Sequence, residues 1–274
     1  MTSAATAAGV SGQGTWEASL LARDFAGNGA GIDAYYDSVL DLTWLRDANL
    51  AKTSGVDTDG FMSFTEANDW AASLSLFGGE NWRLPAVTPV NGGSFNETFT
   101  NNGSSDVGYS AVGRAWGTHS ELGYMSYVHL GNPGFYISDD ENPERFGLEG
   151  TVLVNPAWQG LDGLNPGPFV NVAERPAGVG LVPYWTSTPF FEDAWYLEFN
   201  YGLQWYFDFG FDVPGAGLAW AVHDGDLIGP AVVPVPPALP LFGGALAAML
   251  AWARRSRRPQ VQRPQAQDIH DLSK

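Results

Sequence analysis

The chain has 274 residues, of which 45% are hydrophobic and 14% aromatic, so it has enough apolar material for a folded core and is not a disordered chain. Acidic residues outnumber basic residues by 30 to 13, and the formal net charge of −17 makes a phosphate backbone an unfavourable partner, so we expect no nucleic-acid binding. The absence of cysteine excludes disulfides, thiolate zinc sites and cysteine nucleophiles.

The first 14 residues are mostly small and polar, and we expect them to be disordered. They have neither the basic start nor the apolar stretch of a secretory signal peptide. For an exported protein we therefore expect a true start upstream, or a sequence that begins at its mature end. No linker or repeat interrupts residues 15–229, which we interpret as one loop-rich domain.

A helix is predicted within residues 57–79. Ser63 and Glu66 have the spacing of a capping box, in which each side chain accepts a bond from the backbone N–H of the other. The apolar residues that follow recur at helical spacing on one face, namely Ala67, Trp70, Ala71 and Leu74. Gly78-Gly79 is expected to end the helix.

The same segment offers a second interpretation, a calcium-binding loop. With Gly60 as the turn glycine, Asp57, Asp59, Ser63 and Glu66 fall at the ligand positions 3, 5, 9 and 12 of an EF-hand loop. Position 1, normally Asp, is Gly55, so a principal ligand is missing. The alternative is that Glu66 caps the helix and the aspartates favour its N-terminus. Calcium is the one cofactor that the sequence suggests.

A second helix is predicted to begin at Ser120 and end at Gly131, with Leu122, Met125 and Val128 facing the core. His119, beside its start, is expected to serve in packing or capping, because no histidine has the spacing of a metal enzyme. Four acidic residues then form a loop that is either solvated or a cation site: Asp139, Asp140, Glu141 and Glu144.

Two alternating segments predict a β-hairpin. Trp195, Leu197 and Phe199 precede a turn at Asn200-Tyr201-Gly202, and Leu203, Trp205, Phe207 and Phe209 continue the alternation. A further apolar strand is predicted over Leu218–Val222. Helices early and strands late predict an α+β domain, with two main helices packed on an antiparallel sheet.

The hairpin also supplies the predicted ligand-binding face. If Trp195 and Trp205 face the core, then Tyr196, Gln204, Tyr206 and Asp208 are exposed side by side, and aromatic rings pack well against sugars. The alternative is that these residues only complete the sheet. Trp82, Trp185 and Trp220 are predicted to lie in the core.

The C-terminal region has three parts: a Pro-rich linker at 230–237, an apolar segment with an arginine cluster at 238–258, and a tail at 259–274 that we expect to be disordered. The uncharged stretch 238–253 would span about 24 Å as a helix. Arg254, Arg255, Arg257 and Arg258 follow it, which favours a cytoplasmic location for that end. We interpret it as a short apolar, membrane-targeting helix; the alternative is an amphipathic or buried C-terminal helix.

This layout resembles C-terminal sorting tags of the PEP-CTERM type, in the variant that begins VPLP, with Val233, Pro234, Val235 and Pro236 as the recognition motif. The resemblance implies an exosortase-type processing enzyme as a partner. It also implies an extracytoplasmic protein of a Gram-negative bacterium, tethered to the inner membrane and then moved to the cell surface or extracellular matrix. Such tags usually stop near the arginines, whereas residues 259–274 follow here.

Six segments of the body resemble the Lcl C-terminal domain-like family: residues 34–49, 59–74, 81–85, 116–132, 184–188 and 219–226. The resemblance spans about residues 15–226, and its most specific pair is NWRLP followed by YWTST. It implies a C-type-lectin-like α+β fold and adhesion to polysaccharide or glycosaminoglycan. Two departures are His223, where the family usually has arginine, and the absence of the EPN, QPD and WND signatures of calcium-dependent lectins.

These observations predict a non-catalytic exported surface protein that binds polysaccharide or extracellular matrix components. No GxSxG motif is present, and abundant carboxylates alone do not indicate a glycosidase pair. Two alternatives remain: a self-assembling structural protein of the envelope without a sugar ligand, and a glycan hydrolase, which needs a deep pocket with two facing carboxylates.

Overall fold

The computed structural model describes residues 9–25, 31–110, 116–136, 154–174, 180–190, 193–206 and 217–227. The chain divides into two units, Met1–Ile228 and Gly229–Lys274, and all described residues belong to the first. The linker, the apolar segment, the arginine cluster and the polar tail predicted at 230–274 therefore lie outside the described residues. Within the first unit helices and strands are both present, which confirms the α+β class.

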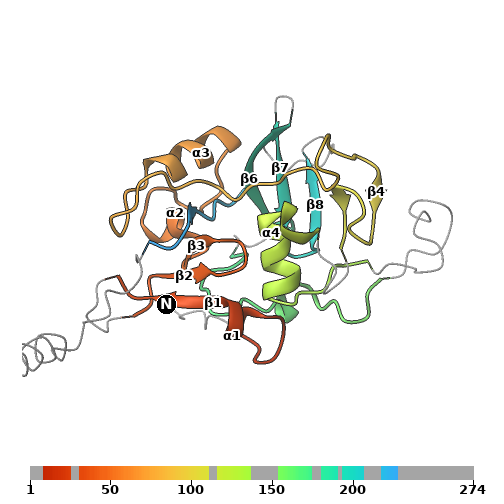
Figure 1. Cartoon of the computed structure of the whole chain (residues 1–274), viewed down its shortest axis with the longest axis horizontal. Helices are drawn as coiled ribbons and strands as arrows, with labels where there is room; N and C mark the ends of the chain where they lie inside the picture. The colour runs from red at the N-terminus through yellow and green to blue at the C-terminus, as the bar shows by residue number, and fades with distance from the viewer. Residues whose placement is uncertain are drawn as a thin grey trace, which may run out of the picture. The chain divides into compact units, whose positions relative to one another are not determined.

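The described strands form two sheets (Figure 1). The first has the order β1-β2-β3-β9 and is antiparallel throughout; its strands are β1 (Leu20–Arg23), β2 (Ala34–Asp37), β3 (Leu42–Leu45) and β9 (Val222–Asp224). The second has the order β4-β5-β8-β7-β6, with strands β4 (Phe99–Thr100), β5 (Val107–Gly108), β6 (Pro183–Phe190), β7 (Asp193–Glu198) and β8 (Leu203–Tyr206). Only β4 and β5 run parallel within it.

The longest described helix, α3 (Phe64–Ser73), lies beside β6 (Figure 1). The predicted capping box is confirmed: the Glu66 N–H donates to Ser63 Oγ at 3.3 Å, and the Ser63 N–H donates to Glu66 Oε2 at 2.9 Å. Ala67, Trp70 and Ala71 are buried, as their spacing predicts. The helix ends at Ser73, before Gly78-Gly79, because Leu74 already has extended backbone angles.

The second predicted helix is present but is not regular. The Ser120 hydroxyl caps α4 (Glu121–Tyr124) by accepting the Gly123 N–H at 3.0 Å, and a π-helical turn, η2 (Met125–His129), continues it. Leu122 and Met125 are buried as predicted, whereas Val128 is only half-buried. The wider π turn rotates the last residues, so that Tyr127 and His129 face the core instead.

The remaining helical turns are short: α1 (Trp16–Ser19), α2 (Leu50–Thr53), η1 (Gly117–His119) and η3 (Gly160–Gly163). Residues 9–14, for which the sequence predicts disorder, bind the body through hydrogen bonds. The Val10 N–H donates to Asn165 Oδ1 at 2.8 Å, and Gln13 Nε2 donates to the Gly131 carbonyl at 3.1 Å. Residues 1–8 lie outside the described part of the chain.

Trp220 lies at the centre of the main core. It is fully buried, its ring contacts Trp44 and Phe169 at centroid distances of 5.0 and 4.7 Å, and its Nε1–H donates to the Leu45 carbonyl at 2.8 Å. The predicted strand over Leu218–Val222 is regular only from Val222, in β9; Leu218 forms a single bridge to Tyr184 in β6. This segment therefore connects the two sheets, from Leu218 beside β6 to Val222 in β9.

Candidate functional site

The hairpin exists, but its register differs from the prediction. A three-residue turn would pair Phe199 with Leu203, whereas the structure pairs Glu198 with Leu203 and Trp195 with Tyr206. Four residues, 199–202, lie between the strands, and this change from an odd to an even number places Trp195 and Trp205 on opposite faces. The buried Glu198 carboxylate stabilises the longer loop by accepting the backbone N–H groups of Val182 at 2.7 Å and Tyr201 at 2.6 Å.

The predicted ligand face is therefore only partly available. Gln204 is 1% exposed, and its Nε2 donates to the Asp106 carbonyl at 2.7 Å, so its predicted exposure is wrong. Tyr196 packs against Trp185, and burial raises the pKa of its hydroxyl. Tyr206 is half-buried and stacked on Phe190 at 3.9 Å. Asp208 lies outside the described residues.

The predicted calcium loop has its carboxylates engaged with backbone groups. Burial disfavours the charge on Asp57, but the N–H groups of Asp59 and Gly60, at 2.9 and 2.6 Å, outweigh it, so the pKa of Asp57 lies below its usual value. The Ser63 hydroxyl and N–H lower the pKa of Glu66. In the residues that the structure describes, no group of three or more acidic or histidine side chains is arranged to hold a metal ion. Calcium binding stays a prediction.

Other predicted features lie elsewhere. The acidic residues Asp139–Glu144 are outside the described residues, as is the sorting segment. No helix in the described ranges reaches the length and apolar character needed to cross a bilayer. His223 is half-buried on β9, with its ring edge-on to Trp82 at a centroid distance of 5.5 Å.

A buried polar chain joins the N-terminal segment to the body. His129 and Asp37 are both fully buried, and His129 Nε2 lies 2.8 Å from Asp37 Oδ2. On the other side of the ring, Nδ1 lies 2.9 Å from the Thr15 hydroxyl. Asp37 Oδ1 also accepts the N–H groups of Val39 and Leu40. These contacts attach residues 9–15 to the body, which accounts for the burial of the His129 and Asp37 side chains.

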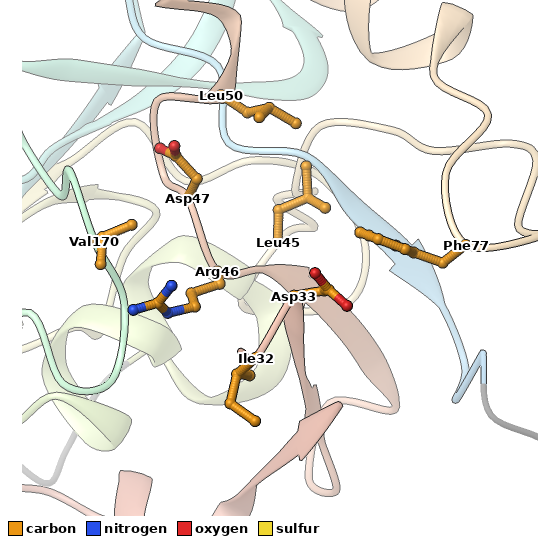
Figure 2. Close-up of a pocket in the computed structure, with 8 residues that line it drawn as sticks. All are labelled: Ile32, Asp33, Leu45, Arg46, Asp47, Leu50, Phe77 and Val170. Atoms are coloured by element: carbon orange, nitrogen blue, oxygen red, sulfur yellow. The ribbon is translucent and has the colours of Figure 1, made fainter. Parts of the chain in front are cut away.

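A pocket of about 230 Å³ lies at the C-terminal end of β3 (Figure 2). Four separate chain segments line it. They contribute Ile32 and Asp33, which precede β2; Leu45, Arg46, Asp47 and Leu50, at and after the end of β3; Phe77; and Val170. The site is not predictable from the sequence, because no local pattern joins these segments. Pockets for small ligands combine apolar walls with a few polar groups, and this one has both.

Phe77 at this pocket has a strained backbone. Leu76 and Gly79 exchange two backbone hydrogen bonds, and the two central residues have positive φ, 58° at Phe77 and 76° at Gly78. Such a two-residue turn favours Asn or Gly at both positions, and a bulky residue there is an outlier. Phe77 is nevertheless 37% exposed, with its ring stacked on Phe25 at 4.3 Å. The turn thus holds an aromatic face at the pocket at the cost of backbone strain.

The backbone of Arg46 is fixed on both sides of the same pocket. Its N–H donates to the Asp33 carbonyl at 3.0 Å, and its carbonyl accepts the Val170 N–H at 2.9 Å. The side chain lies near Tyr35: burial raises the pKa of the Tyr35 hydroxyl, and the positive charge of Arg46 offsets part of that rise. Arg46 forms no ion pair with a carboxylate in the described ranges.

The two carboxylates of the pocket have different partners. Asp47 accepts three hydrogen bonds, from the Asn49 N–H, Asn171 Nδ2 and the Thr53 hydroxyl. Within the described ranges, Asp33 accepts a hydrogen bond from the Phe25 N–H, at 2.9 Å through Oδ2. Figure 2 shows the Asp33 carboxylate directed toward the side of Phe77 and the Asp47 carboxylate directed away from it. The pocket therefore has an acceptor at Asp33 on the side of the aromatic ring of Phe77, whereas the guanidinium of Arg46 is directed toward Val170, away from both (Figure 2).

Comparison with protein-family models, with curated proteins and with solved structures gives no match to this chain.

Proposed function

We propose that this protein is a non-catalytic, exported surface module that binds polysaccharide or another matrix component through the pocket around Phe77. The observation that carries the proposal is a partly exposed aromatic ring, held in a strained backbone conformation at a pocket that Asp33 also lines. An aromatic face next to hydrogen-bonding groups suits a sugar ring, which has apolar C–H faces and a rim of hydroxyls. A cavity of about 230 Å³ suits one sugar residue and not a large ligand.

The proposed C-type-lectin-like fold and the Lcl C-terminal-like family draw support from the core. Each of the six segments that carry the resemblance contributes one buried tryptophan: Trp44, Trp70, Trp82, Trp116, Trp185 and Trp220. The predicted core positions of Trp82, Trp185 and Trp220 are confirmed. Because these motifs supply core residues, the resemblance bears on the fold, and the ligand must be argued from the pocket.

Export, tethering at the inner membrane and processing by an exosortase-type enzyme rest on the sequence of the C-terminal region. Cell fractionation tests this part separately: we expect a full-length form in the membrane fraction and a shorter form at the cell surface or in the matrix. A single form in the cytosol would contradict it.

A binding function accords better with the pocket than glycan hydrolysis does. Hydrolysis by a carboxylate pair requires two carboxyl groups that face each other across the scissile bond. Asp47 already accepts three hydrogen bonds and is directed away from Asp33 (Figure 2). We therefore expect no turnover of the polysaccharides that bind, as measured by the release of reducing ends.

The decisive experiment compares the full chain with two variants on a glycan array and in a pull-down with secreted exopolysaccharide, with and without calcium. Phe77→Ala removes the ring at the pocket, and Tyr206→Ala removes a ring from the hairpin face. Val56→Ala, at an exposed position that does not line the pocket, is the matched control. We expect binding to be lost only with Phe77→Ala.

Other outcomes assign the function elsewhere. Loss of binding only with Tyr206→Ala would move the site to the hairpin face. No binding by the unmodified chain under either condition would refute the proposal, and ordered multimers in light scattering would then favour a self-assembling envelope protein.

A further inference from the structure

The pocket around Phe77 presents one carboxylate beside the aromatic ring. Asp47 is directed away from the ring and accepts three hydrogen bonds, and the guanidinium of Arg46 is directed toward Val170 (Figure 2). Asp33 is half-buried, and its carboxylate is directed toward the side of Phe77. The polar group that a ligand meets next to the ring is therefore an anion.

Asp33 has one carboxylate oxygen to offer to a ligand. Its Oδ2 accepts the Phe25 N–H at 2.9 Å, whereas Oδ1 accepts no hydrogen bond from a residue in the described ranges. Among those residues, no Lys, Arg or His forms an ion pair with Asp33. The apolar residues of the same pocket are Ile32, Leu45, Leu50, Phe77 and Val170. Because a carboxylate next to apolar walls is incompletely hydrated, a cation that reaches it gains more than it would at an open surface.

The charge of the whole body favours the same kind of ligand. Residues 1–230 contain 28 acidic and 7 basic residues. Such a charge raises the concentration of cations near the surface and repels anionic polymers. An acidic glycosaminoglycan, the ligand that the family resemblance implies, would meet this repulsion at long range and a like charge at Asp33. The charges therefore favour a ligand of the opposite sign.

An ammonium group on the sugar matches these features. It donates charge-assisted hydrogen bonds to a carboxylate, and these are roughly twice as strong as those of a neutral donor such as a hydroxyl or an amide N–H. Phe77 then contacts the apolar part of the same sugar. We propose that Asp33 determines specificity, and that the pocket selects a hexosamine whose amino group is free and protonated over the same sugar in its N-acetylated form. This inference rests on the proposed function and narrows its ligand to a polysaccharide with free amino groups.

The proposal predicts how binding responds to salt. A chain of net charge −17 attracts a cationic sugar, and added salt screens this attraction over a Debye length of about 10 Å at 0.1 M. We therefore expect the affinity for the free amine to fall as salt is raised from about 0.05 M to about 0.5 M. The affinity for the N-acetylated sugar should stay nearly constant, because that ligand carries no charge.

The test uses titration calorimetry of the full chain with two matched ligands, a short oligosaccharide of N-acetylglucosamine and the same oligosaccharide with one acetyl group removed. A single free amino group keeps several ammonium groups of one ligand from binding the acidic surface together. We expect the free amine to bind about tenfold or more tightly at low salt. Asp33→Asn retains an acceptor for the Phe25 N–H and removes the charge, so it should abolish this preference. Asp69→Asn removes the same charge at an exposed position outside the pocket lining and should retain it.

The outcomes separate this inference from the proposed function. Equal affinity for the two oligosaccharides, tighter binding of the acetylated form, or equal effects of Asp33→Asn and Asp69→Asn would overturn the role of Asp33 while leaving polysaccharide binding in place. A simple alkylamine that binds as tightly as the oligosaccharide with the free amine would overturn the selection of a sugar. Binding of neither oligosaccharide and of no exopolysaccharide would overturn both proposals. Circular dichroism and the thermal midpoint of each variant establish that it is folded, and the comparison of the two ligands on the unmodified chain depends on no variant.

Discussion

Substitutions of Phe77 separate the stability that its ring provides from the strain that its backbone stores. The ring is 37% exposed, so it buries roughly 100–150 Å², which is worth about 3 kcal/mol at about 25 cal/mol per Å². Phe77→Ala removes this contribution but retains a Cβ at φ 58°. Phe77→Gly removes the ring and also relieves the left-handed strain, which is worth about 1–2 kcal/mol. Against this gain, the greater freedom of glycine in the unfolded chain lowers the stability of the folded state by about 0.4–1 kcal/mol.

The glycine variant should therefore be more stable than the alanine variant by about 0.5–1 kcal/mol, and Phe77→Asn should resemble Phe77→Gly because Asn tolerates this conformation. Urea unfolding followed by tryptophan fluorescence measures the difference; with a slope near 2.5 kcal/mol per M, the midpoints should differ by about 0.3 M. All three variants should lose polysaccharide binding. An alanine variant as stable as the glycine and asparagine variants would refute the argument that the turn is strained.

Three further predictions use the same unfolding assay. Ser63→Ala should cost about 1 kcal/mol at neutral pH through loss of the cap. Because the capping box lowers the pKa of Glu66, the stability that ionised Glu66 provides is present at neutral pH and is lost as the pH falls through that lowered pKa. Ser63→Ala should therefore show a weaker loss of stability in acid, and an unchanged pH profile of stability would contradict this prediction. Trp220→Ala should cost about 3–5 kcal/mol, and a smaller loss would mean that the core collapses around the gap. Gln204→Leu should lower the free energy of unfolding by about 1–3 kcal/mol, because it removes the donor to the buried carbonyl of Asp106. Glycan binding should be unchanged, and a loss of binding would indicate that Gln204 belongs to the ligand-binding face.

Features determined within a few residues are predicted correctly. The capping box at Ser63 and Glu66 follows from spacing, since both hydrogen bonds lie within one helical turn. The burial of Ala67 and Trp70 follows from helical periodicity. The end of the helix is predicted too late, because the two glycines after Phe77 belong to a β-turn and not to a helix stop.

The faces of the hairpin depend on contacts that its own sequence does not contain. Asn200-Tyr201-Gly202 is a reasonable turn, but the buried Glu198 side chain binds the backbone of Val182 as well as that of Tyr201, which favours the four-residue loop. A change of one residue in the loop exchanges the two faces of the second strand. The prediction for Gln204 is wrong for this reason, although both strands are present. The predicted continuation of the second strand through Phe207 and Phe209 lies outside the described residues.

The pocket combines residues that are far apart in the chain, so it is not predictable from periodicity or motif spacing. One of its residues nevertheless carries a physical signal in the sequence. An aromatic residue directly before two glycines places a bulky side chain where a two-residue turn prefers Asn or Gly. The structure places this strained residue at the pocket with its ring partly exposed, which is the physical reason to propose binding at Phe77 and not at the hairpin face.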